Sequence, residues 1–79
     1  MVVRIEERTV NPELTRLLLD FIKEHGEGRI RKESLKLIEQ GKYEKALLAY
    51  DEEGRLVGVS IWEGVGYWLS VTIVAKWAR

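Results

Sequence analysis

The spacing of apolar residues in the first 26 positions predicts a strand followed by a helix. In residues 2–9, Val3 and Ile5 alternate with Arg4 and Glu6, as expected for a short strand whose polar face meets water. Asn11 and Pro12 then provide an N-cap and a first helical position, and Gly26 marks the end of the helix. The apolar residues between them form one stripe: Leu14, Leu17, Leu18, Phe21 and Ile22. We therefore expect this helix to pack through that stripe.

The rest of the pattern predicts a second helix and three strands. The segment between Gly28 and Gly41 has a thinner apolar face, made by Ile30, Leu35, Leu37 and Ile38. From Tyr43 the period changes to two, and the runs "KALLAYD", "RLVGVSIWE" and "YWLSVTIVAKW" are joined by short glycine-containing turns. The chain is thus predicted to be one α+β domain over residues 1–79, ordered β-α-α-β-β-β. Its strands would form an antiparallel meander with two helices on one face.

The last two predicted strands carry large apolar residues at both parities, which is typical of strands buried on both faces. Two helices can cover only one face of the sheet. Each large apolar side chain left in water on the other face costs about 1.5–3 kcal/mol. We therefore expect a homodimer or a partner protein to cover that face, with Trp62, Trp68 and Val71 as interface candidates.

The aromatic residues Trp62, Tyr67, Trp68 and Trp77 allow two interpretations. They could stack on a nucleic-acid base, as aromatic side chains do in single-strand-binding proteins. Aromatic residues near the end of a sheet are more often core residues or interface anchors, and we favour that interpretation.

Composition excludes several classes of protein. The chain has no cysteine and a single histidine, so neither disulfides nor a zinc site is expected. Thirteen basic and thirteen acidic residues balance, which gives no overall field to attract nucleic acid or an anionic membrane. No apolar run is long enough to span a bilayer, and the charged N-terminus does not resemble a signal peptide. A cytoplasmic protein is expected.

Two local features have both a functional and a structural interpretation. A basic group, made by Arg29, Arg31, Lys32 and Lys36, could bind a phosphate or an RNA backbone. Glutamates are interleaved with it, which favours a solvated helix face. His25 could act as a general base, but a solvated imidazole at a helix C-terminus is the simpler interpretation.

The element order, the hairpin "YDEEGRLVG" and the ending "TIVAKWAR" together resemble the N-terminal half of the GNAT superfamily of acetyl-CoA-dependent N-acetyltransferases. The hairpin of that family commonly has an acidic or glycine turn, apolar residues and a glycine, as at Gly54, Leu56, Val57 and Gly58. Its fourth strand closes on a valine, and five residues later an Arg or Gln opens the phosphate-binding loop. Val74 and Arg79 have this spacing.

The resemblance implies that the backbone of Thr72, Ile73 and Val74 would pair with the pantetheine arm of acetyl-CoA, and that Arg79 would begin the loop for its phosphates. The glycines of that loop, the following helix and the acceptor half of the fold are not among these residues. No carboxylate lies on the predicted fourth strand, so Glu63 is the nearest, weak candidate for a catalytic base.

Two function hypotheses follow. The chain is either a GNAT-related N-acetyltransferase fragment, which as 79 residues is expected neither to bind acetyl-CoA nor to catalyse acetyl transfer, or a non-catalytic, self-associating interaction module. Nucleic-acid binding would depend on the basic group alone.

Overall fold

The computed structural model describes residues 2–62 and 70–78. Its elements are β1 (Val2–Thr9), α1 (Pro12–His25), α2 (Lys32–Glu39), β2 (Lys45–Asp51), β3 (Leu56–Trp62), β4 (Ser70–Val74) and a short 3-10 helix, η1 (Lys76–Ala78). The predicted α+β order is confirmed.

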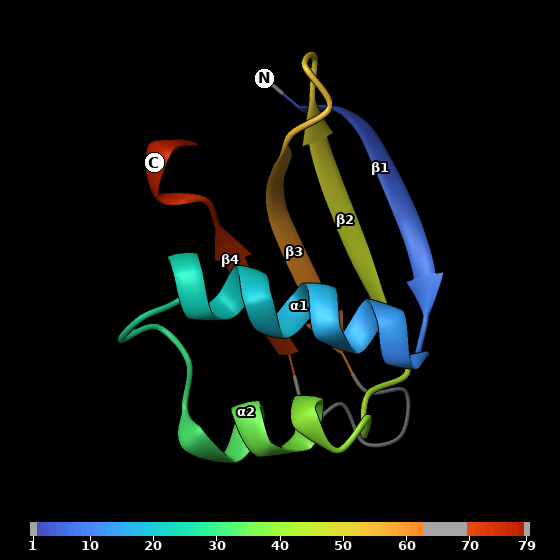
Figure 1. Ribbon diagram of the computed structural model, residues 1–79, viewed down its shortest axis with the longest axis vertical. Helices are drawn as coiled ribbons and strands as arrows, with labels where there is room; N and C mark the ends of the chain where they lie inside the picture. The colour runs from blue at the N-terminus through green and yellow to red at the C-terminus, as the bar shows by residue number, and fades with distance from the viewer. Residues whose placement is uncertain (1, 63–69, 79) are drawn as a thin grey trace.

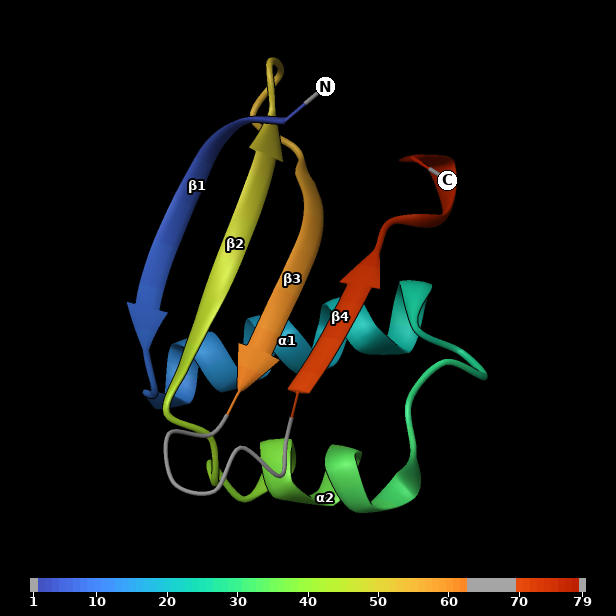
Figure 2. The ribbon, with the colours of Figure 1, turned by 180° about the vertical axis from the view of Figure 1, so that it is seen from behind.

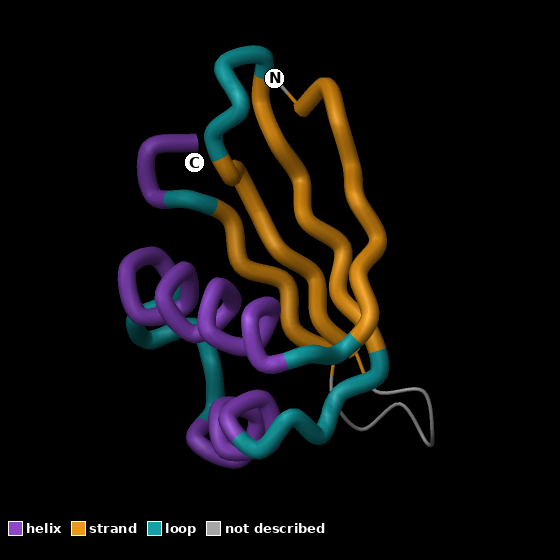
Figure 3. The backbone as a smooth tube through the Cα atoms, turned by 45° about the vertical axis from the view of Figure 1, so that its right-hand side comes forward, coloured by secondary structure: helices purple, strands orange, loops and turns teal. Residues whose placement is uncertain are grey.

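The four strands form one antiparallel sheet in the order β1-β2-β3-β4, the predicted meander. Figure 1 shows α1 crossing in front of the sheet, and Figure 3 shows α1 and α2 on the same side of it. Seen from behind, in Figure 2, the strands lie in front of α1, and α2 lies beyond the ends of the strands. The sheet therefore has a helix-covered face and an open face.

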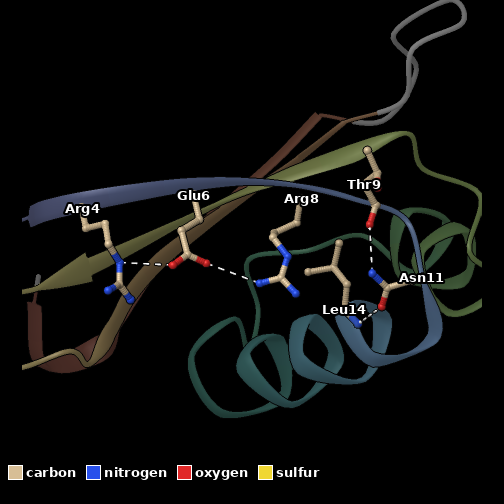
Figure 4. A network of polar contacts seen from close by, with 6 residues as sticks. All are labelled: Arg4, Glu6, Arg8, Thr9, Asn11 and Leu14. Atoms are coloured by element: carbon tan, nitrogen blue, oxygen red, sulfur yellow. Dashed lines mark hydrogen bonds and ion pairs between the residues drawn. The ribbon is translucent and has the colours of Figure 1, made fainter.

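Helix α1 begins where the sequence predicts. The Asn11 side chain accepts a hydrogen bond from the Leu14 N–H at 2.8 Å and donates one to the Thr9 carbonyl at 3.3 Å, which links the end of β1 to the first turn of α1 (Figure 4). The hydroxyls of Thr15 and Tyr43 are 2.7 Å apart and join α1 to the segment before β2. Local capping and one long-range bond thus set the position of α1.

The core lies between the helices and the covered face of the sheet. Leu18 from α1 and Ile38 from α2 are completely buried, as are the inward-facing residues Leu48 and Ile61 of β2 and β3. Ile73 of β4 is 1% exposed. The apolar stripe predicted for α1 therefore packs on alternate residues of three strands.

Strand β4 is shorter than the run from which it was predicted. Ala75 N–H still donates to the Val57 carbonyl at 2.7 Å, but the next N–H, of Lys76, donates to Nδ1 of His25 at 3.1 Å. Ala78 N–H then bonds back to the Ala75 carbonyl. The chain leaves the sheet here, so Trp77 belongs to η1 and not to a strand.

Asp51 organises the turn between β2 and β3. One carboxylate oxygen accepts the N–H groups of Glu53 and Arg55, each at 2.9 Å, and the other accepts Nε of Arg55 at 2.8 Å. Gly54 has a φ of +80°, the left-handed conformation that this three-residue turn requires. Burial alone would raise the pKa of Asp51, but the hydrogen bonds and charge of Arg55, with the Glu53 N–H, outweigh it and lower the pKa.

We predict that Asp51→Asn makes folding stability less dependent on pH in the acid range. Because the pKa of Asp51 is lower in the folded chain than in the unfolded chain, its ionised form stabilises the fold above the unfolded pKa of about 3.9. That contribution is lost as the pH falls through the folded pKa. Urea unfolding at neutral pH and near pH 3 measures the difference, with Glu52→Gln in the same turn as control. An unchanged pH dependence in Asp51→Asn would contradict this role.

Candidate functional site: the open face of the sheet

Strand register identifies the residues of the open face. Leu47 of β2 lies opposite Ser60 of β3, which lies opposite Thr72 of β4. Their neighbours in sequence, such as Leu48 and Ile61, are buried beneath the helices. By the same alternation, the open face includes Ile5, Glu7, Lys45, Leu47, Ala49, Gly58, Ser60, Trp62, Thr72 and Val74. Val57, which the pairing skips at the bulge beside Ala49, also lines this face.

A shallow, mainly apolar groove of about 620 Å³ runs over this face. Its lining includes residues from all four strands, and Trp77 and Ala78 of η1 close one side. The Trp77 side of the groove is anchored, because the Arg55 guanidinium lies 4.2 Å from the Trp77 ring centroid and is held by Asp51. The groove therefore has a fixed aromatic wall.

The polar groups of the open face are paired with one another. Lys45 Nζ is 3.6 Å from the Glu7 carboxylate and 5.4 Å from the Trp62 ring centroid. The hydroxyls of Ser60 and Thr72 are 3.0 Å apart, near the middle of the face. Because each polar group already has a partner, covering the face leaves few of them unsatisfied.

Strand β1 has three of its four charged residues on the helix side, and Ile5 and Glu7 on the open side. Arg4, Glu6 and Arg8 lie in a row, with Glu6 oxygens 3.2 Å from Arg4 Nε and 3.4 Å from Arg8 NH1 (Figure 4). Ile5, which is 62% exposed, points to the open face opposite Ala49. A domain whose only core lay under its helices would have the reverse arrangement. The pattern of β1 fits a sheet whose open face is also covered.

The three predicted interface residues have different outcomes. Trp62 lies on the open face, half buried opposite Lys45. The assignment of Val71 to the uncovered face is wrong, because Val71 is 8% exposed and packs in the core under the helices. Trp68 lies outside the described residues.

The residues expected at the cofactor site lie in different environments. Thr72 and Val74 are on the open face and line the groove, whereas the side chain of Ile73 is in the core. In the described part of the chain β4 has one strand neighbour, β3, so its outer side is a sheet edge. Arg79 and Glu63 lie outside the described residues.

The interpretation of His25 as a solvated residue is wrong. It is 7% exposed, its ring centroid is 4.6 Å from that of Phe21, and its Nδ1 accepts the N–H of Lys76. The partner is 51 residues away in sequence, so helix position alone could not reveal the contact. His25 holds the end of β4 against α1, and no substrate path to it is evident among the described residues.

Sequence reasoning did not single out Ile5 and Leu47 as residues of the groove. The turn at Asp51 and Gly54 could not give the partner of Leu47, because a bulge between Ala49 and Tyr50 shifts the pairing of β2 and β3 by one residue. Trp77 was among the aromatic residues interpreted as core or interface anchors, and it lines the groove, but its place in η1 depends on where the chain leaves the sheet.

The described residues contain no group of three or more His, Asp or Glu side chains arranged to hold a metal ion. None of the described helices has the length and apolar character needed to cross a membrane. The chain matches no protein-family model, no curated protein and no solved structure. The GNAT resemblance therefore stays a prediction.

We predict opposite effects for lysine at two adjacent positions of β4. Val71→Lys places an unpaired charge in the core and should lower the free energy of unfolding by on the order of 3–5 kcal/mol. Thr72→Lys points to the open face, loses one exposed hydrogen bond and should cost about 1 kcal/mol. Urea unfolding at low protein concentration compares the two variants. Equal destabilisation would contradict the assigned parity.

Proposed function

We propose that this domain self-associates, with its open face packing against the open face of a second copy. The observation that carries the proposal is the apolar groove on that face, to which β1 contributes Ile5 while Arg4, Glu6 and Arg8 lie on the other side. Sheets that pack face to face are stabilised by interdigitating apolar side chains, as in β-sandwiches.

Charge favours a second copy over a strongly charged partner. The open face has one residue of each sign, Glu7 and Lys45, already paired, and the whole chain has a net charge of zero. In a two-fold dimer the same patch meets itself, so a patch with a net charge would repel its copy. This face has no such repulsion and offers little to attract an acidic or basic partner.

The edges of the sheet favour face-to-face packing over edge pairing at β1. Charged side chains alternate along β1, a feature that protects edge strands from adding further strands. The apolar area is on the face, and the anchored Trp77 beside the groove has the character of an interface anchor.

The second candidate function is binding of the pantetheine arm of acetyl-CoA along β4, as the GNAT resemblance implies. It is supported by the position of β4 at the edge of the sheet and by Thr72 and Val74 in the groove lining. In this proposal the chain is related to N-acetyltransferases, and these 79 residues do not carry out acetyl transfer.

Ile5→Lys should convert the dimer into a monomer. At tens of micromolar, light scattering during size exclusion should give twice the 9.2 kDa mass of one chain for the wild type. Lysine at this exposed position leaves the fold intact but places two like charges in the dimer interface. We expect the dissociation constant to rise at least about tenfold, equivalent to about 1.4 kcal/mol.

Val10→Lys is the matched control, because Val10 is also an exposed apolar residue but does not line the groove. It should remain dimeric. A wild-type monomer at these concentrations, or equal dissociation of both variants, would overturn self-association through the open face.

Calorimetry with acetyl-CoA tests the second candidate. We expect no micromolar binding by these 79 residues, because the phosphate-binding loop that the family places after the position of Arg79 is not among them. The titration is repeated with Ile5→Lys, which is expected to be monomeric. This shows whether the wild-type β4 edge fails to bind acetyl-CoA because the dimer covers it or because the edge has no affinity for acetyl-CoA. A micromolar dissociation constant would contradict the requirement for that loop.

A further inference from the structure

A small cavity of about 260 Å³ lies beside β4 and shares one lining residue, Thr72, with the groove on the open face. The cavity is lined by the connection between α1 and α2, the first turn of α2, and β4. In Figure 2 that connection runs beyond the outer side of β4. The lining residues are Arg29, Ile30, Arg31, Ser34, Val71 and Thr72.

The cavity is positively charged. Arg29 and Arg31 are both exposed, and neither forms an ion pair with another described residue. Glu27 and Glu33 are close in sequence but do not line the cavity. Two guanidinium groups are therefore available to an anion, with no acidic side chain in the lining.

The first turn of α2 adds backbone donors. Arg31 is the N-cap and makes no side-chain hydrogen bond to the helix. The first bond within the helix runs from Leu35 N–H to the Arg31 carbonyl at 3.0 Å, so the N–H groups of Lys32, Glu33 and Ser34 precede it. Such groups and the helix dipole favour an anion at this end.

Ser34 provides independent evidence of a ligand. It is 7% exposed, and its hydroxyl makes no hydrogen bond to any described residue. Every fully buried side-chain oxygen among the described residues has a hydrogen-bond partner. The Ser34 oxygen has none, so it must be accessible from the cavity. Because the oxygen is accessible and has no partner among the described residues, the Ser34 hydroxyl is available to a group that enters the cavity.

We propose that this cavity binds the phosphate group of a small phosphate ester. Two arginines match the charge of a phosphate dianion, and their planar guanidinium groups suit its oxygens. The Ser34 hydroxyl and the helix N–H groups supply further donors. The apolar walls at Ile30 and Val71 accommodate the carbon part of the ester.

Amide chemical shifts of the 79-residue chain test this proposal, with inorganic phosphate as the probe and acetate as the carboxylate comparison, at neutral pH and constant ionic strength. Phosphate should shift the Lys32–Ser34 amides saturably and bind more tightly than acetate. Arg31→Gln should raise the phosphate dissociation constant at least about tenfold, as expected for loss of a charged hydrogen bond. Ser34→Ala, which keeps every charge, should raise it by a factor of about three or more.

Lys36→Gln is the matched control, because it removes one positive charge from α2 at a residue that does not line the cavity. Its dissociation constant should stay within about twofold of the wild type, as expected for a distant, screened charge. Equal weakening in Lys36→Gln and Arg31→Gln would mean general charge attraction and overturn the site. Acetate binding as tight as phosphate, or the absence of saturable shifts, would also overturn it.

Discussion

The packing of α1 against one face of the sheet is the constraint on which the rest of the structure depends. Leu18 and its neighbours in the stripe meet alternate residues of β2, β3 and β4, and this contact decides which parity of each strand is inside. Because the side chains of a strand alternate, the choice fixes at once the composition of the opposite face. The groove, its paired hydroxyls and its aromatic wall are all consequences of where α1 lies.

Strand β1 shows how the two faces of the sheet differ in the free energy of exposing their side chains to water. Its charged row is on the side where α1 supplies the core to the other strands, yet the whole strand stays largely exposed, so the charges remain solvated. Ile5 on the other side is left in water in a single chain. Covering the open face would remove that apolar surface from water at about 25 cal/mol per Å² while leaving the charged row solvated. The arrangement of β1 is thus consistent with the proposed covering of the open face.

Features set by neighbouring residues could be predicted from the sequence, and features set by distant contacts could not. Asn11, Pro12 and the apolar stripe defined α1, and the turn residues defined the order of the strands. Apolar residues at both parities of β4 left its orientation open, so Val71 was placed on the wrong face. His25 was predicted to be solvated because its contact with Lys76 depends on the folded position of β4. The burial of Ser34 beside the two arginines likewise exists only after α2 has packed near β4.

Three surfaces meet along β4, and the alternation of its residues keeps them chemically separate. Val71 and Ile73 belong to the core, the Thr72 hydroxyl belongs to the open face through Ser60, and the outer side of the strand forms one wall of the basic cavity. A side-chain change at Thr72 therefore acts on both the open face and the cavity, whereas a change at Arg31 acts on the cavity without entering the groove. The proposed self-association depends on the apolar residues of the open face, whereas the proposed phosphate binding depends on Arg29, Arg31, Ser34 and the N–H groups of α2. Because these groups differ, although Thr72 lines both sites, the two proposals predict that either property can be lost while the other persists.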